Sequence, residues 1–301
     1  MKDSVMKDDG FVVAIIGIGL IGGSMAIALK ENGFARKVIG VDANLQHCSE
    51  ALQLKLVDKI LDLQSAMREA DIVILATPVN IADMLISQIL TLAKEHVVVD
   101  VGSTKNSICN ISDQHIKRKR FVATHPMWGT EFSGPSAAIK GAFKHKAVVI
   151  CDKDKSDIDA IRITEILYKS MDMHILYMDS ISHDLHAAYI SHISHISSFA
   201  LANTVLEKEK EENAIFEMAS GGFESTVRLA KSSASMWLPI FKQNRENILD
   251  VLNEHIAQLK KFKSCLEKEN YDYLLDLITN ANEIRKVLEP VNKEQTLIEV
   301  Q

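Results

Sequence analysis

The apolar residues of the first 178 positions fall into short, nearly unbroken runs that alternate with stretches of helical periodicity. Such runs are rich in β-branched residues and are typical of strands buried on both faces of a parallel sheet. The stretches between them have the spacing of crossover helices. We therefore predict a doubly wound, mostly parallel α/β domain over residues 1–178. Its strands are expected at 12–16, 38–41, 72–76, 97–101, 121–124, 147–150 and 175–178.

After residue 179 the strand pattern stops, and only helical periodicity remains up to a tail that contains Pro290. This predicts a second, all-α domain over residues 179–301. The stretch 187–206 is apolar on more than one side, which is typical of a helix that packs against a partner subunit as well as its own chain. We therefore expect a homodimer that assembles through this helical domain.

Composition narrows the class of protein without changing this architecture. Apolar residues make up 47% and charged residues 25% of the 301 positions, the balance of an ordinary globular protein. The net charge of −6 gives no global attraction to nucleic acid or anionic lipid, so we expect neither as a partner. Residues 11–29 carry no charge, but glycines interrupt them, and we expect no membrane span there. Four scattered cysteines favour a reducing, cytoplasmic location.

A glycine motif, Gly17-Ile-Gly19-Leu-Ile-Gly22, follows the first predicted strand and opens a helical stretch. In this context Gly17 allows a tight turn, Gly19 lets a pyrophosphate approach the backbone, and Gly22 lets the helix pack on the sheet. Asp42 ends the second strand, where a carboxylate binds the adenosine ribose and repels the extra phosphate of NADP. These features predict a Rossmann-type domain that binds NAD; a glycine turn used only for packing is the alternative. The expected cofactor contacts are Gly17, Gly19, Leu20, Ile21, Gly22, Asp42, Thr77, Pro78 and Ser103.

A histidine follows the strand expected at 121–124, on the edge of the sheet where ligands bind. Pro126 biases His125 toward an extended backbone, which would project its ring from the strand end. Imidazole has the ordinary pKa closest to working pH, so His125 is our candidate base for the oxidation of a carbinol. Ser103, at the end of the preceding strand, would either orient this ring or cap the following helix.

The helical domain offers an arginine and four histidines. Arg228 follows a glycine-hinged loop, and its guanidinium fork is suited to a substrate carboxylate, although a lone arginine is more often a surface residue. On one straight helix, the pairs His183/His186 and His192/His195 would point to opposite sides. We therefore expect no metal site, with one pair facing the cleft between the domains and the other facing solvent or a subunit contact.

Taken together, in order and spacing, the motifs resemble those of the prephenate dehydrogenase family over nearly the whole chain. They are Gly17-x-Gly19-x-x-Gly22, Asp71-Ile-Val-Ile-Leu-Ala-Thr-Pro78, Asp100-x-Gly-Ser103-x-Lys105, His125-Pro-x-x-Gly129-Thr-Glu131, Ser191-His-Ile-Ser-His195, and Gly221-Gly-Phe…Arg228 with Trp237. The resemblance implies NAD-dependent oxidative decarboxylation of prephenate to 4-hydroxyphenylpyruvate in tyrosine biosynthesis.

The resemblance also implies roles for individual residues. His125 is expected to be the catalytic histidine, with Ser103 as its orienting partner. Arg228 is expected to hold a substrate carboxylate, and His195 to line the substrate pocket. Thr130 and Glu131, which share a motif with His125, are expected to bind substrate as well.

Two positions depart from the family pattern. Ser194 stands where the family usually has a proline, and Ser225 where it usually has an aspartate, which puts a helix kink and an ionic gate in doubt. Beyond the helical domain we expect no fused chorismate mutase and no complete regulatory domain, and hence no tyrosine feedback through one. Three other functions stay open: an arogenate dehydrogenase, a hydroxy-acid dehydrogenase, which would normally need a lysine base, and a non-catalytic NAD-binding regulator.

Overall fold

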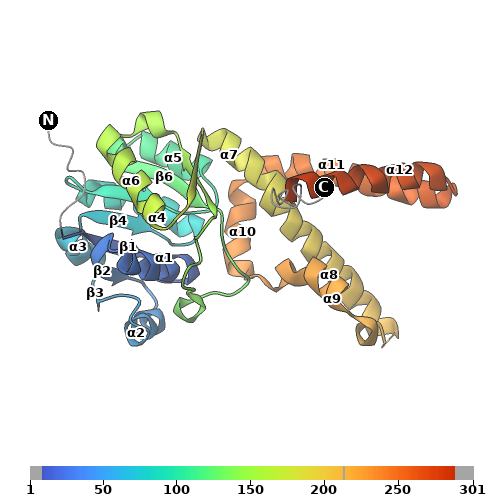
Figure 1. The fold of residues 1–301 in the computed structure, drawn as a ribbon, viewed down its shortest axis with the longest axis horizontal. Coiled ribbons are helices and arrows are strands. Elements are labelled where there is room, and N and C mark those ends of the chain that lie inside the picture. The colour runs from blue at the N-terminus through green and yellow to red at the C-terminus, as the bar shows by residue number, and fades with distance from the viewer. Residues whose placement is uncertain (1–8, 213, 289–301) are drawn as a thin grey trace, which may run out of the picture. The chain divides into compact units, whose positions relative to one another are not determined.

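The computed structural model describes residues 9–212 and 214–288, and its first part forms one eight-stranded sheet (Figure 1). The strand order is β3-β2-β1-β4-β5-β6-β7-β8, and neighbouring strands are parallel except β6 with β7. The strands are β1 (Phe11–Ile16), β2 (Ala35–Val41), β3 (Lys59–Ile60), β4 (Ile72–Leu75), β5 (Val97–Asp100), β6 (Phe121–Pro126), β7 (Ala147–Cys151) and β8 (His174–Met178). The predicted doubly wound, mostly parallel sheet is confirmed.

Each of the seven predicted apolar runs forms a strand, whereas the sequence did not predict β3. That strand is only two residues long, Lys59–Ile60, and both of its residues are partly exposed, so it leaves no apolar run. Strand order reverses between β1 and β4, because the chain winds outward from β1 through β2 in one direction and from β4 through β5 in the other. Ligands bind at such a switch point in open α/β sheets.

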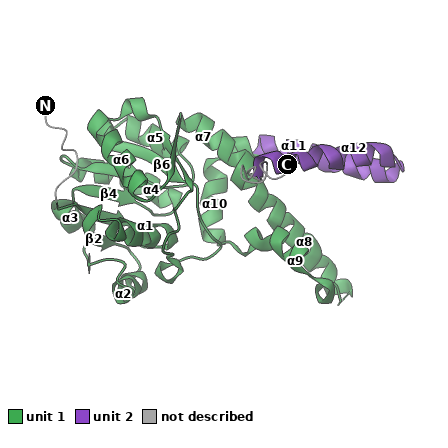
Figure 2. Cartoon of the chain, viewed as in Figure 1, with its two compact units in different colours: residues 1–248 green, residues 249–301 purple. Residues whose placement is uncertain are grey.

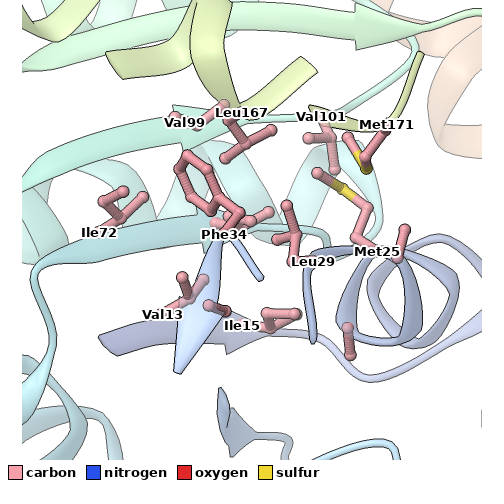
Figure 3. Packing of buried hydrophobic residues seen from close by; sticks show 14 of the residues in the cluster. Val13, Ile15, Met25, Leu29, Phe34, Ile72, Val99, Val101, Leu167 and Met171 are labelled. Atoms are coloured by element: carbon pink, nitrogen blue, oxygen red, sulfur yellow. The ribbon is translucent and has the colours of Figure 1, made fainter. Parts of the chain in front are cut away.

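The core explains why the strands read as unbroken apolar runs. Val13 and Ile15 of β1 face a cluster that includes Met25 and Leu29 of α1 (Leu20–Glu31), as Figure 3 shows. The alternate residues of β1 pack into a second cluster on the other face of the sheet. Because both faces are covered, burial stabilises each aliphatic side chain by about 1.5–3 kcal/mol whichever way it points.

Helices cover the sheet and continue beyond it. Those up to the last strand are α1, α2 (Leu45–Gln53), α3 (Leu63–Glu69), α4 (Val79–Leu92), α5 (Asn106–Asp113) and α6 (Ile158–Ser170). After the sheet come α7 (Ser180–Ala187), a π-helical turn η4 (Ala188–His192), α8 (Ile193–Glu212), α9 (Gly221–Val227), the 3-10 turn η6 (Arg228–Lys231), α10 (Ala234–Gln243), α11 (Arg245–Glu267), α12 (Tyr271–Ala281) and α13 (Arg285–Leu288). The Asp179 carboxylate begins this series by accepting a hydrogen bond from the Ser182 backbone at the first turn of α7.

The chain divides into two compact units, residues 1–248 and 249–301 (Figure 2). The first unit therefore contains the sheet together with α7 to α10, and all the site residues discussed below. The domain boundary that we predict after residue 178 separates the part of the chain that contains strands from the part that is only helical. It differs from the boundary between the compact units and stays a prediction. No helix among the described residues is both long and apolar enough to cross a membrane.

Candidate active site

A cavity of about 800 Å³ lies at the carboxyl ends of the strands around the switch point. We call it the cofactor cavity. Eight of the nine predicted cofactor contacts line it, and they are Gly17, Gly19, Leu20, Ile21, Asp42, Thr77, Pro78 and Ser103. On the opposite side, Ser233, Met236 and Ile240, in or next to α10, form part of the wall. The structure thus brings the predicted residues together in one concave site.

The three glycines of the motif differ in what surrounds them. A Cβ on Gly22 would lie 2.1 Å from the Gly17 carbonyl oxygen and 2.9 Å from a methyl group of Ile15, so Gly22 packs α1 against the sheet and does not line the cavity. Gly17 has a φ of +93°, which favours glycine. A Cβ on Gly19 would meet no atom within 4 Å. Open space at Gly19, just before the first N–H groups of α1, leaves room for a phosphate.

Two polar groups in the cofactor cavity fit a dinucleotide. The Asp42 carboxylate is held in place because it accepts hydrogen bonds from the backbone N–H groups of Ile18 and Asn44, each at 2.9 Å. The hydroxyl of Thr77 is buried and has no partner among the described residues. An orphaned buried hydroxyl costs free energy unless a ligand bonds to it. The cavity therefore suits a ligand with hydroxyl groups near Asp42 and a polar group near Thr77.

His125 lies on β6, where the strand ends, and its partner is another histidine. Its Nδ1 atom lies 2.9 Å from Nε2 of His183 on α7. Burial, reinforced by His183, lowers the pKa of His125 well below its usual range. The imidazole is therefore neutral at neutral pH and can accept a proton.

The predicted orientation of His125 by Ser103 is not what the structure shows. Among the hydrogen bonds of the described residues, none joins Ser103 to His125. Ser103 faces the cofactor cavity, while His183 reaches Nδ1 of His125 from α7. Ser103 does not cap the next helix either, because α5 begins at Asn106 with Lys105 in the capping position.

The prediction that the histidines form two opposed pairs is wrong. His183 and His192 are both buried, whereas His186 is exposed. The segment is not one straight α-helix, because the π-helical turn η4 adds a residue and sets the following residues back by about 100°. His195 then falls about 20° from His183 in phase. Within residues 9–212 and 214–288, no three His, Cys, Asp or Glu side chains are placed to share a metal ion.

His195 and Arg228 lie near each other on the helical side of the site. The ring of His195 stacks on Trp237 with centroids 3.5 Å apart, and its Nδ1 bonds to the Ser191 carbonyl oxygen at 2.9 Å. Burial lowers the pKa of His195, and the positive charge of Arg228 lowers it further. The guanidinium of Arg228 donates to the Glu131 carboxylate at 3.1 Å, and half of its side chain is exposed to solvent.

The neighbouring predicted residues make local contacts. The Thr130 hydroxyl accepts a weak hydrogen bond of 3.3 Å from the backbone of Phe132. Ser194, where the family has a proline, donates to the Ile190 carbonyl oxygen at 3.0 Å. Ser225, where the family has an aspartate, bonds to the Gly222 carbonyl oxygen at 2.9 Å. In this structure Glu131, rather than position 225, supplies the carboxylate that pairs with Arg228.

Several buried polar residues of the site were missed by the sequence analysis. Lys105 is fully buried, and its ammonium group bonds to the Asp100 carboxylate and to the Thr124 carbonyl oxygen. Asp184 and Asn244 are buried as well and bond to other site residues. Of these three residues, only Lys105 belongs to a motif that the sequence analysis named, the one that also contains Ser103. Nothing in the sequence indicates that Asp184 bonds to His183 or that Asn244 bonds to His192.

Family models match most of the chain. The nucleotide-binding domain of prephenate dehydrogenase matches residues 25–177, and the dimerization domain of prephenate dehydrogenase matches residues 179–280. The chain is 32% identical over 284 residues to the prephenate dehydrogenase of Bacillus subtilis, covering 93% of this chain and 76% of that protein. It is 30% identical over 279 residues to the cyclohexadienyl dehydrogenase of Zymomonas mobilis, covering 92% and 95%.

Solved structures agree with these sequence matches. The prephenate dehydrogenase from A. aeolicus, in complex with hydroxyphenyl propionate and NAD+, superposes with a TM-score of 0.84 at 27% identity, covering 92% of this chain and 98% of that chain. An arogenate dehydrogenase from Synechocystis, at 23% identity and a TM-score of 0.74, shares the fold. Two family models that together cover most of the sequence, and a relative aligned over nine-tenths of it, place this chain in the prephenate dehydrogenase family.

Proposed function

We propose that this protein catalyses the NAD-dependent oxidative decarboxylation of prephenate to 4-hydroxyphenylpyruvate. The observation that carries the proposal is that a dinucleotide-type cavity and a neutral, partly buried imidazole lie at the ends of β1, β2, β4, β5 and β6, on the same edge of one sheet. The substrate, prephenate, is inferred from membership of the prephenate dehydrogenase family. A non-catalytic regulator would not need a base at this position.

The cofactor proposal is NAD rather than NADP. Asp42 presents a fixed carboxylate in the cofactor cavity, and Ala43, Asn44 and Leu45 after it supply no arginine for an additional phosphate. Gly17, Gly19, Leu20 and Ile21 would hold the pyrophosphate, with Gly22 packing the helix behind them. Thr77, Pro78 and Ser103 would lie along the rest of the molecule.

The reaction divides into tasks for these residues. NAD+, when bound, accepts the hydride from the ring carbon that carries the hydroxyl group. His125 accepts the proton of that hydroxyl group, and Arg228 binds a carboxylate of the substrate. His195, Thr130 and Glu131 complete the pocket, with Glu131 holding the guanidinium of Arg228. Loss of CO₂ then makes the ring aromatic and leaves its electron pair on the ring oxygen, which takes the proton back from His125. Formation of the aromatic ring drives the overall reaction forward.

We propose that the protein works as a cytoplasmic homodimer. The match to a dimerization domain over residues 179–280 supports the dimer. Large apolar side chains on the helices of this region are also exposed in the single chain, among them Ile190, Leu206, Leu259, Leu266 and Leu275. The four cysteines are all free and buried, as suits a reducing compartment.

A direct assay tests the activity. Purified protein is mixed with prephenate or arogenate, each with NAD+ or NADP+, and NADH or NADPH formation is followed by absorbance. We expect the highest kcat/KM for prephenate with NAD+. A higher value for arogenate would reassign the substrate. If the protein binds NAD+ but reduces neither cofactor with either substrate, the proposed enzyme activity is wrong and a non-catalytic NAD-binding regulator is the better interpretation.

A further inference from the structure

A chain of three side chains leads from His125 into the protein interior. Nδ1 of His125 lies 2.9 Å from Nε2 of His183, and Nδ1 of His183 lies 2.8 Å from a carboxylate oxygen of Asp184. His183 and Asp184 are each only 2% exposed. His183 and Asp184 are consecutive residues of α7, whereas His125 lies on β6, 58 residues before His183. The chain therefore joins the candidate base to a buried carboxylate on another element.

Asp184 is fixed by bonds from three directions. Its carboxylate accepts hydrogen bonds from the backbone N–H groups of Lys105 at 2.7 Å and Asn106 at 2.9 Å, where α5 begins. Its carbonyl oxygen accepts a hydrogen bond from the side-chain amide of Asn244 at 2.6 Å. Two backbone N–H groups thus bond to this carboxylate, and a carboxylate without a proton only accepts hydrogen bonds.

The bonding pattern determines which nitrogen of each ring carries hydrogen. Because the Asp184 carboxylate only accepts, Nδ1 of His183 must donate to it. Burial lowers the pKa of His183, so the ring is neutral and its Nε2 has a lone pair. Nδ1 of His125 must then donate to that lone pair. The neutral His125 ring is left with its own lone pair on Nε2, which has no hydrogen-bond partner among the described residues.

We propose that His183, anchored by Asp184, is a positioning residue that holds His125 in the Nδ1–H tautomer and so keeps Nε2 free to accept the proton of the substrate hydroxyl. This inference rests on the proposed function, because only that function supplies a substrate hydroxyl whose proton Nε2 of His125 can accept. The proton moves from the hydroxyl oxygen to Nε2 of His125 as the hydride leaves. His125 keeps its Nδ1–H bond to His183 throughout, so its ring does not have to rotate during the reaction.

Nitrogen-15 NMR of the wild-type protein tests the tautomer without any substrate. The two nitrogens of a neutral imidazole have different chemical shifts, and the His125 signals are assigned by their loss in His125→Asn. We expect Nδ1 to be the protonated nitrogen of His125 at neutral pH. A proton on Nε2 instead would overturn the proposal, whatever the activity of the protein.

Two substitutions at the same position test the consequence for turnover. His183→Leu removes the acceptor, and we expect kcat to fall by about 10²-fold, while KM for NAD+ changes less than twofold. In His183→Gln the amide N–H₂ group faces Asp184 and its oxygen faces Nδ1 of His125, so kcat should recover to within tenfold of the wild type. Equal losses in both variants, or no loss in His183→Leu, would contradict the proposed role.

The two experiments also separate this inference from the proposed function. A wild-type protein with the Nδ1–H tautomer that reduces no NAD+ with prephenate or arogenate would reject the proposed function and leave the arrangement of His125, His183 and Asp184 as found. A wild-type enzyme active on prephenate with Nε2 protonated would reject only the positioning role. If His183→Leu does not fold, the NMR result on the wild type decides the question.

Discussion

The cofactor cavity and the buried polar side chains beside it are built in different ways. In the cofactor cavity the key features are backbone geometry and the absence of side chains, as at Gly19, together with one fixed carboxylate, Asp42. On the other side, the structure depends on hydrogen-bonded side chains. We call this second group the histidine network, and its members are His125, His183, Asp184, His192 and Asn244.

This difference predicts two kinds of sensitivity to mutation. The cofactor cavity tolerates a change of polarity at many positions but not an added methyl group where the backbone or a ligand needs the space. The histidine network tolerates similar shapes but not the loss of a donor or acceptor, because a buried group without its partner costs about 1–3 kcal/mol. Four predictions test this comparison.

The largest effect is expected at His125. His125→Asn removes the base but keeps an N–H group that can donate to His183, so the fold should survive. We expect kcat with prephenate to fall by about 10²- to 10⁴-fold. NAD+ affinity, measured by calorimetry, should be unchanged because His125 does not line the cofactor cavity. A kcat within tenfold of the wild type would remove His125 as the base.

The next largest effect is expected at Arg228. Arg228→Ala should raise KM for prephenate by about 10- to 100-fold, since a charge-assisted hydrogen bond contributes about 1.5–3 kcal/mol. Thermal stability should hardly change, because an exposed ion pair with Glu131 contributes little. The matched control is Lys231→Ala, on the same turn and paired with Glu224. Equal effects of the two substitutions on KM would indicate general electrostatics instead of a specific contact.

Two glycine substitutions separate packing from binding in the cofactor cavity. Gly22→Ala places a methyl group against the Gly17 carbonyl oxygen and should lower the free energy of unfolding by about 1–3 kcal/mol, measured by urea denaturation. Gly19→Ala meets no protein atom, so it should leave stability unchanged while weakening NAD+ binding about tenfold. If Gly19→Ala binds NAD+ normally, the pyrophosphate does not approach this residue.

The effect that is smallest at neutral pH is a pH dependence of stability, which comes from the histidine network. Burial lowers the pKa of His192 to about 4, compared with about 6.5 in an unfolded chain. Between these values the unfolded state binds a proton that the folded state does not. His192 should therefore lower the free energy of unfolding by up to about 1.4 kcal/mol per pH unit as the pH drops from 6.5 toward 4, in addition to what the other buried histidines contribute.

Urea denaturation at several pH values measures this slope. His192→Gln should make it shallower, whereas His186→Gln, an exposed histidine of the same segment, should leave it unchanged. An identical slope in His192→Gln and the wild type would show that His192 does not carry the effect.

Much of the fold could be predicted because its signals are local. A strand buried on both faces must be apolar at consecutive positions, which made β1, β4 and β5 visible in the sequence. The antiparallel pairing of β7 with β6 was not visible, because a buried apolar run reads the same in either direction. The π-helical turn η4 also left no recognisable pattern, and this is why the histidines were assigned to the wrong faces.

The same distinction divides the site. The sequence alone indicated the side of the cofactor cavity that the strand ends form, because a glycine motif and a strand-ending aspartate lie on short, continuous segments. It did not indicate the α10 side, which Ser233, Met236 and Ile240 line. Tertiary structure decided which group orients His125: Ser103 was the nearest candidate in the motifs, yet His183 fills the place. Hydrogen bonds between side chains far apart in sequence depend on how their elements pack, and His183 on α7 is 58 residues from His125 on β6. The extra residue in η4 changes only the rotation of the residues after it, His192 and His195 relative to His183.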